Sequence, residues 1–554
     1  MRRISISLAM LVGGAALMIA AQFAGAATER KGGIFVVGTT GASVQVDPQV
    51  AYITTAWWLE YATAAKLYNY PDKRGGAGNT LQPEVASSFR VSNGGKRYTF
   101  FIRRGFRFSD GTPVTARSFS YAIDRVVNRE LASPGAQFIT DPTGTEIVGA
   151  KEVYDGQSFG PHVRGVRVRG NRLIINLERP DGTFMSKITM PFFQAASTKL
   201  PLNREVVNVD ALGDLPSAGP YAISRNDVND VTSLRRNPYW HPGPGRQRPR
   251  NLEGLDLLWN LNEETSYNQV LASQLDEGPL PAAHVQETAD RFGVNRTRFW
   301  TEPVNCTGYL PMNMSRPLFR GNAALRRAVN YVISRRAYVD QAGPYAGQPW
   351  TRLFNPGVPG WTNANAYPLE RDVPKARAMA AGHFRDGHVT ISYLASGITN
   401  PNQALIVRQD LIDLGFDPDN IEMKWYSGAG WWGNRMKFAD IGSSFGWCSD
   451  YPDPYDWLNV LFYGESVDDE NTVNYSHMDL PKWNAKLDAA AKLVGPKRYK
   501  VYGQLDLDLM RQIAPVAVER TYNNRYLFSD RVEPKSLVYQ GIYSDWSIPA
   551  LALK

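Results

Sequence analysis

Residues 442–446 read Gly-Ser-Ser-Phe-Gly, which matches the Gly-x-Ser-x-Gly pattern around the nucleophile of many serine hydrolases. Asp450 and His477 follow Ser444 in the order in which such an enzyme places its acid and its base. The pattern requires a helix directly after the serine, but the Pro-Asp-Pro run at 452–454 opposes a helix there. A secreted hydrolase that uses Ser444 is therefore kept only as an alternative, and we predict no catalytic residues.

The same segment has the residue types of a ligand-binding wall. Trp447, Tyr451 and Trp457 offer flat aromatic faces, and Asp450 and Asp453 offer carboxylates in a loop that proline stiffens. A carboxylate beside aromatic rings and shielded from water would hold an ammonium group strongly through charge-assisted hydrogen bonds. Residue types alone favour this interpretation no more than a rigid structural loop with solvated aspartates. Three more tryptophans lie just upstream: Trp425, Trp431 and Trp432.

The sequence contains two cysteines, Cys306 and Cys448, and six histidines. Two cysteines in an oxidising compartment can form a disulfide, but two separate buried thiols remain open because the sequence gives no distance between them. None of the histidines stands at a spacing typical of metal ligands. We therefore predict no metal and no cofactor.

The N-terminus has the three parts of a secretory signal peptide. Residues 2–3 are arginines, residues 8–21 form an apolar run too short to span a bilayer comfortably, and residues 24–26 read Ala-Gly-Ala. These parts predict a cleaved signal peptide at 1–26. Because no cysteine stands at the cleavage site, we expect a periplasmic protein without a lipid anchor.

Composition bounds the class of protein further. A chain of 554 residues is too long for one core, so two or three domains are expected. The formal net charge is +8, but lysine and arginine are scattered along the chain. A nucleic-acid partner would need a concentrated basic patch, so we predict none and interpret the charge as a solvated surface.

The chain alternates strands and helices in its second half. Apolar periodicity predicts a helix over 323–339, and further helices over 402–414, 482–494 and 498–512. The strands between them are predicted over 388–394 and 421–426. This alternation is typical of an α/β layered domain.

The first half is richer in strands. Residues 34–38 and 98–102 are predicted strands, and 166–177 read as a hairpin around Gly170-Asn171. Thr115 is the predicted cap of a helix over 116–127.

Several blocks, in order from about residue 32 to the C-terminus, resemble the periplasmic solute-binding protein family 5 of peptide, dipeptide and nickel importers. Residues 102–116, which read Ile-Arg-Arg-Gly-Phe-Arg-Phe-Ser-Asp-Gly-Thr-Pro-Val-Thr-Ala, are very close to the family signature. The other similar blocks lie at 81–86, 219–221 with 237–240, 325–331, and 446–454.

The resemblance implies the type II periplasmic binding protein fold in its large three-domain form, with a hinge and a ligand cleft between two lobes. It places a discontinuous lobe I at 27–72, 206–305 and 520–554. An inserted extra domain at 73–205 would pack on lobe I, and lobe II would cover 306–519. Closure about the hinge would bury the ligand and expel water.

The resemblance also implies roles for single residues. The position of Asp450 holds the ligand α-ammonium in peptide-binding members, and cysteines at positions resembling Cys306 and Cys448 form a bridge in oligopeptide-binding members, so we expect this disulfide. Some peptide binders place an arginine where Ser444 stands here, and Arg435 upstream could substitute for it. The predicted ligand-binding residues are Asp450, Trp447, Gly446, Cys448, Tyr52, Thr54, Trp431, Arg435 and Ser444.

We therefore expect the substrate-binding component of an ATP-driven (ABC) importer, a monomer that delivers peptides to a permease and ATPase complex in the inner membrane. The alternative is a receptor of the same fold for an oligosaccharide, an opine or a metal chelate. A cleft of stacking aromatics without a paired Asp450 would favour a sugar. Loss of turnover on exchange of Ser444 would instead favour the hydrolase.

Overall fold

The computed structural model describes residues 33–554 except 142–143, 159, 395–400, 427–434 and 468–471. The predicted signal peptide at 1–26 and Trp431 lie outside the described residues. Within that part of the chain, every helix is too short or too polar to cross a bilayer.

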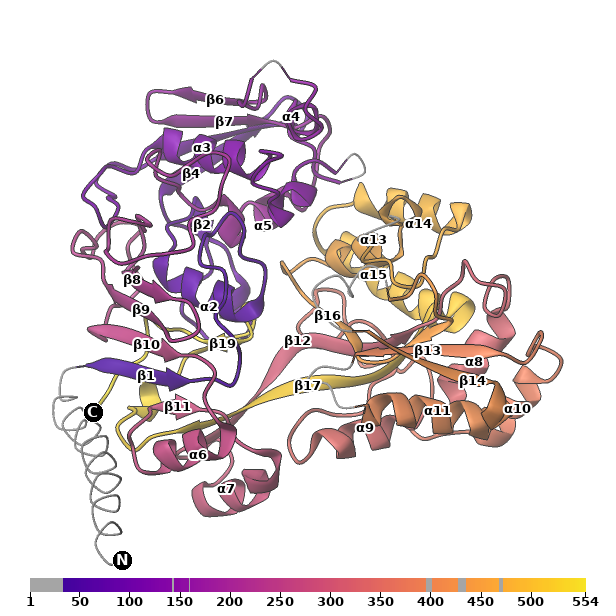
Figure 1. The fold of residues 1–554 in the computed structure, drawn as a ribbon. Coiled ribbons are helices and arrows are strands. Elements are labelled where there is room, and N and C mark those ends of the chain that lie inside the picture. Colours follow the sequence, from indigo (N-terminus) through magenta and orange to yellow (C-terminus); the bar gives the residue numbers. More distant parts are fainter. Residues whose placement is uncertain (1–32, 142–143, 159, 395–400, 427–434, 468–471) are drawn as a thin grey trace, which may run out of the picture.

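One eight-stranded sheet runs through both halves of the molecule (Figure 1). Its strands follow in the order β16-β12-β17-β11-β1-β10-β9-β8. Their bounds are Ile34–Gly38 for β1, Tyr221–Asp227 for β8, Val231–Arg236 for β9, Gly254–Leu258 for β10, Glu277–Gly278 for β11, Phe299–Pro311 for β12, Phe445–Cys448 for β16 and Val516–Phe528 for β17. Strands from the beginning, middle and end of the chain therefore share one sheet.

Two long strands, β12 and β17, cross from one half of the molecule to the other as an antiparallel pair (Figure 1). Each has 13 residues, which corresponds to about 40 Å of extended chain. Their register shifts between Val304 and Thr307 and again between Gly308 and Tyr309. Such irregularities bend and twist a ribbon locally. The two halves are thus the lobes of the predicted fold, joined by a twisted ribbon.

The segment predicted as the inserted domain, 73–205, contains a four-stranded antiparallel sheet in the order β4-β5-β7-β6. The bounds are Ala86–Ser92 for β4, Arg97–Ile102 for β5, Val166–Arg169 for β6 and Arg172–Asn176 for β7. Helix α3 (Ala116–Val126) packs on it through residues such as Phe119 and Ile123. The Thr115 side chain accepts a hydrogen bond from the Arg117 amide, which confirms the predicted cap. The predicted hairpin is also confirmed, while the domain boundaries stay a prediction.

The other lobe has the predicted α/β layering. A parallel sheet runs in the order β14-β13-β15 and carries helices against one core. The bounds are Val389–Leu394 for β13, Ile421–Tyr426 for β14, Ile441–Gly442 for β15, Ala323–Val332 for α8, Val373–Ala380 for α10 and Asn402–Leu414 for α11. A second core lies among α13 (Tyr455–Phe462), α14 (Pro481–Ala491) and α15 (Gly495–Asp508).

The predicted helix over 323–339 is wrong in one respect, because it is two helices. α8 ends at Val332, and α9 (Arg335–Ala342) begins after an extended Ile333. Tertiary contacts hold the break: Asp410 accepts hydrogen bonds from the backbone amide and the hydroxyl of Ser334. The buried Arg335 guanidinium donates to the Val518 carbonyl of β17. These partners lie far away in the sequence, so periodicity could not reveal them.

Candidate functional site

The short strand β16 lies at the end of the large sheet, so its outer edge is open for pairing among the described strands. Its inner edge pairs antiparallel with β12, with Gly446 opposite Gly308 and Cys448 opposite Cys306. The turn before β16 requires a left-handed residue, and Ser444 takes it with φ of 59°. A strand, not a helix, follows this serine, so the structural context of a hydrolase nucleophile is not met.

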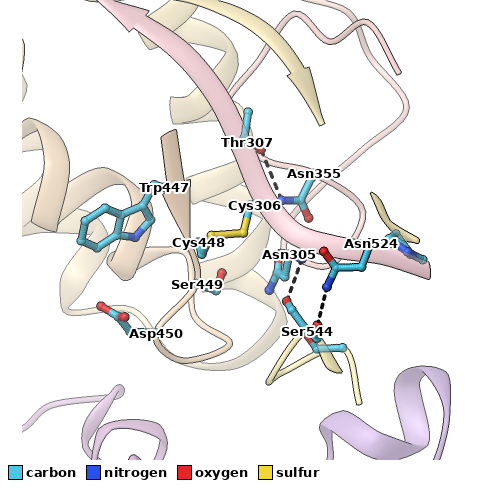
Figure 2. Close-up of a disulfide and its surroundings, with 12 residues drawn as sticks. Asn305, Cys306, Thr307, Asn355, Trp447, Cys448, Ser449, Asp450, Asn524 and Ser544 are labelled. Carbon is cyan, nitrogen blue, oxygen red and sulfur yellow. Dashed lines mark hydrogen bonds between the residues drawn. A yellow bond between two sulfur atoms is a disulfide. The ribbon is translucent and has the colours of Figure 1, made fainter. Parts of the chain in front are cut away.

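Cys306 and Cys448 form the expected disulfide (Figure 2). The bond joins directly opposed residues of β12 and β16, and the chain leaves β16 immediately after it. The Trp447 ring and the Asp450 carboxylate lie on the same side of this bond (Figure 2). The disulfide therefore fixes the strand from which the Asp450 loop starts.

Asp450 meets Tyr52 of the opposite lobe. The Tyr52 hydroxyl donates a hydrogen bond of 2.7 Å to Asp450 Oδ2, across 398 residues of sequence. Asp450 is only partly accessible to solvent. Desolvation raises the pKa of its carboxyl to about 7, and the Tyr52 hydrogen bond partly opposes this rise. The site thus holds a carboxylate that would gain strongly from a cationic partner.

Asp456, in the first turn of α13, is hydrogen-bonded to Asp450 and Trp447. Its Oδ2 accepts hydrogen bonds from the Asp450 backbone amide at 2.9 Å and from Trp447 Nε1 at 3.4 Å. Burial, and then repulsion from Asp450, raise the pKa of Asp456 well above its usual value. Asp456 therefore holds the Asp450 backbone and the Trp447 indole in place. The sequence analysis missed Asp456, because the Pro-Asp-Pro run at 452–454 was interpreted as opposing a helix, whereas α13 begins directly after it.

Tyr451 has a structural role. It is 1% exposed, and its ring packs edge-to-face on Phe138 of the other lobe at 6.2 Å between centroids. The next tyrosine, Tyr455, donates a hydrogen bond of 2.9 Å to Asp141 there, and the Lys187 ammonium lies 4.8 Å above its ring. The prediction that Tyr451 offers a ligand-facing surface is therefore not supported, because the ring contacts the other lobe.

A cavity of about 810 Å³ lies between the lobes next to this contact, within the range of small-molecule sites. It brings together Thr54, Ser444, Gly446, Trp447 and Cys448 of the predicted residues. Tyr52 and Asp450, which are joined by a hydrogen bond, lie two positions in the sequence from the lining residues Thr54 and Cys448. The rest of the wall is Thr55, Val304, Cys306, Gln341, Ala342, Gln403, Phe445, Arg520, Tyr522, Asn524, Arg525, Ser544 and Asp545.

Arg435 does not line this cavity. It is fully buried, and its guanidinium donates to the Ser443 and Ser444 carbonyls at 3.1 Å each. It also lies against the Phe445 ring. We therefore assign Arg435 to holding the turn between β15 and β16, and the suggestion that it receives a ligand carboxylate is not carried forward.

Two lobes joined by a crossing ribbon, with a ligand-sized cavity between them, define a class of binding protein that closes over its ligand. A family profile described as bacterial extracellular solute-binding proteins, family 5 Middle, matches residues 80–469. The chain belongs to this family, as the resemblance of its motifs predicted.

Individual relatives are distant. The chain is 22% identical over 456 residues to the periplasmic oligopeptide-binding protein OppA of Escherichia coli (strain K12), with 80% of each chain covered. It is 24% identical over 455 residues to the probable deoxycholate-binding periplasmic protein YgiS of the same strain, with 79% of each covered. Among solved structures it is similar to clavulanic acid biosynthesis oligopeptide binding protein 2, with a TM-score of 0.81, 22% identity, and 95% and 96% of the two chains covered. Similarity at this level establishes the fold. The class of ligand has to be inferred from the residues of the site.

Proposed function

We propose that this protein is the extracytoplasmic substrate-binding component of an ABC importer and that it captures a peptide between its lobes. The observation that carries the proposal is the partly buried Asp450 carboxylate, which meets Tyr52 of the opposite lobe beside a cavity of about 810 Å³. Its pKa of about 7 reflects desolvation without a cationic partner. A ligand ammonium would supply that partner.

The free edge of β16 supports an extended peptide rather than a compact solute. An unpaired strand edge offers backbone amides and carbonyls that an added strand can satisfy, whatever its side chains are. Gly446 and Trp447 of this strand both line the cavity, and Trp447 offers an apolar wall there. The peptide would thus be held by its backbone and its α-ammonium, while its side chains occupy the cavity.

Closure would couple binding to delivery. The Tyr52–Asp450 hydrogen bond joins the two lobes. A ligand that binds Asp450 would therefore bind at the contact between the lobes. A permease and ATPase complex would then recognise the closed form. We expect the exported protein to act as a monomer in the periplasm after cleavage of residues 1–26, and N-terminal sequencing of the mature protein would test the cleavage.

Direct identification of the ligand tests the proposal. Protein purified from its native periplasm is denatured, and the released small molecules are identified by mass spectrometry. Peptides with a free α-amino group are the expected result. A bile acid, an oligosaccharide or a metal chelate in stoichiometric amount, with no peptide, would contradict the proposal.

A further inference from the structure

One cationic residue that lines the cavity, Arg520, lies in the same cross-strand row as Gly446 of β16. Gly446 of β16, Gly308 of β12 and Arg520 of β17 are successive partners across three adjacent strands. Side chains opposite one another in neighbouring strands share a face of the sheet. Tyr522 and Glu519 lie over Gly308 in this row, and Gly446, Arg520 and Tyr522 all line the cavity.

Gly308 has no room for a side chain. A Cβ there would come within 2.7 Å of Glu519 Oε1 and would overlap the Tyr522 hydroxyl. The Tyr522 ring therefore lies over Gly308, and the Arg520 guanidinium lies 4.6 Å from the centre of that ring. A guanidinium held on an aromatic face presents its edge to a planar acceptor.

Arg520 lacks the close carboxylate partner that three other buried arginines have. It is 7% exposed, and its Nε has no hydrogen bond among the described residues. Its carboxylate neighbour, Glu519, stands 3.7 Å away and has no hydrogen bond to either oxygen. Three buried arginines elsewhere have close carboxylate partners: Arg125 with Asp47 at 2.7 Å, Arg352 with Asp506 at 2.6 Å, and Arg498 with Asp453 at 2.8 Å. Arg520 Nη1 donates a hydrogen bond of 3.3 Å to the Tyr338 carbonyl.

The surrounding charges leave Arg520 incompletely neutralised. Burial raises the pKa of Glu519 to about 7, so near neutral pH it carries only part of a negative charge. Arg525 lines the same cavity and adds positive charge, although its Nη1 already donates to the Ala342 and Pro344 carbonyls after α9. Asp545 is the acidic side chain on this wall, and its Oδ1 accepts hydrogen bonds from the Trp546 amide and the Tyr526 hydroxyl.

We propose that Arg520 receives a carboxylate of the bound ligand, and that Arg525 adds to the positive potential there. This inference rests on the proposed function, since for a peptide the group is the C-terminal carboxylate. The ligand is then a short peptide with both ends free, held by Asp450 at one end and by Arg520 at the other. Arg520 of β17 thus takes the role of carboxylate receptor that was first suggested for Arg435.

The spacing of the two anchors limits the length of such a ligand. Neighbouring strands lie about 4.8 Å apart, so the row from Gly446 to Arg520 covers about 10 Å. Asp450 follows Gly446 by four residues, which adds at most about 14 Å. The Cα atoms of the anchors are then no more than about 24 Å apart. An extended peptide advances about 3.4 Å per residue, so about eight residues is the upper limit.

The test compares two peptide libraries that differ in one group. Randomised tripeptides and tetrapeptides are prepared with a free C-terminal carboxylate and as C-terminal amides, and binding to the full mature protein is measured by equilibrium dialysis with mass spectrometry. The wild-type protein is expected to prefer the free acids by about tenfold or more, as a charge-assisted hydrogen bond would give. In Arg520→Gln this preference falls to about one, while the affinity for the amides is unchanged.

Matched variants separate the role of Arg520 from a fold defect. Arg336→Gln removes a positive charge from an exposed side chain of the same lobe and must keep the wild-type preference. Glu519→Gln combined with Arg520→Gln leaves no unpaired buried charge and must also give a ratio near one. Arg520→Lys keeps the charge and must keep part of the preference. Thermal melting of each variant reports its fold.

The outcomes that contradict the carboxylate role of Arg520 differ from those that contradict peptide binding. Equal binding of acids and amides by the wild-type protein, or an unchanged preference in the folded double variant, overturns the carboxylate role and leaves peptide binding intact. Binding of neither library contradicts peptide capture itself, and this inference with it.

Discussion

Exchange of Asp450 for asparagine removes the charge on which the proposed site depends while keeping the shape of the side chain. A charged hydrogen bond contributes about 1.5–3 kcal/mol, so the variant should bind a peptide about 10- to 150-fold more weakly at pH 8. Asp450 itself is only half ionised near pH 7, because desolvation raises its pKa to about 7. The loss should therefore depend on pH.

The direction of that dependence follows from which form binds. An ammonium pairs with the ionised carboxyl, and at pH 6 only about one tenth of Asp450 would be ionised before binding. Wild-type affinity should fall about fivefold from pH 7 to pH 6, a range in which the peptide α-amino group (pKa about 7.7–8.0) stays mostly protonated, while the asparagine variant should stay nearly constant. Binding at pH 7 should also release about half a proton more in the wild-type protein than in the variant.

Isothermal titration calorimetry in buffers of different ionisation enthalpy measures both quantities. The ligand is the peptide recovered from the native protein, and the same peptide with an acetylated amino group is the control. The acetylated form should bind the two proteins equally and without proton release. Equal affinity of the two proteins for the free peptide at pH 8, or a pH profile shared by both, would refute the role of Asp450.

Two further predictions concern the groups that surround Asp450. Tyr52→Phe removes the hydrogen bond that lowers the pKa of Asp450, so the pH midpoint of peptide binding should move upward; an unchanged midpoint would mean that this contact does not act in the free protein. The disulfide between Cys306 and Cys448 closes a loop of 142 residues, for which chain entropy gives about 5 kcal/mol as an upper value. Exchange of both cysteines for serine should lower the free energy of unfolding in urea by about 2–5 kcal/mol, and a stability equal to that of the oxidised wild-type protein would contradict this.

The fold was predictable because its determinants are local or belong to family motifs. The hairpin over 166–177 and the Thr115 cap follow from turn and capping chemistry within a few residues. The break between α8 and α9 was not predictable, because it depends on Asp410, whose carboxylate lies 76 positions from Ser334. Local periodicity contains no information about such a partner.

The site was predictable in its residue types and less so in their orientation. Trp447 lines the cavity and Asp450 contacts Tyr52 of the opposite lobe, while their role in ligand binding stays a prediction. Arg435 was suggested as a ligand contact from the family resemblance and Tyr451 from its residue type, but the turn at Ser444 and the contact with Phe138 direct them into protein. Side-chain direction depends on tertiary packing, and a single sequence does not state it.

The most direct test of the ammonium anchor is a crystal structure of the protein with the peptide recovered from its native source. The peptide α-amino nitrogen should lie about 2.7–2.9 Å from an Asp450 carboxylate oxygen, with the peptide backbone paired to the outer edge of β16. A well-ordered peptide whose amino nitrogen lies elsewhere, with Asp450 bonded to Tyr52 alone, would contradict the account.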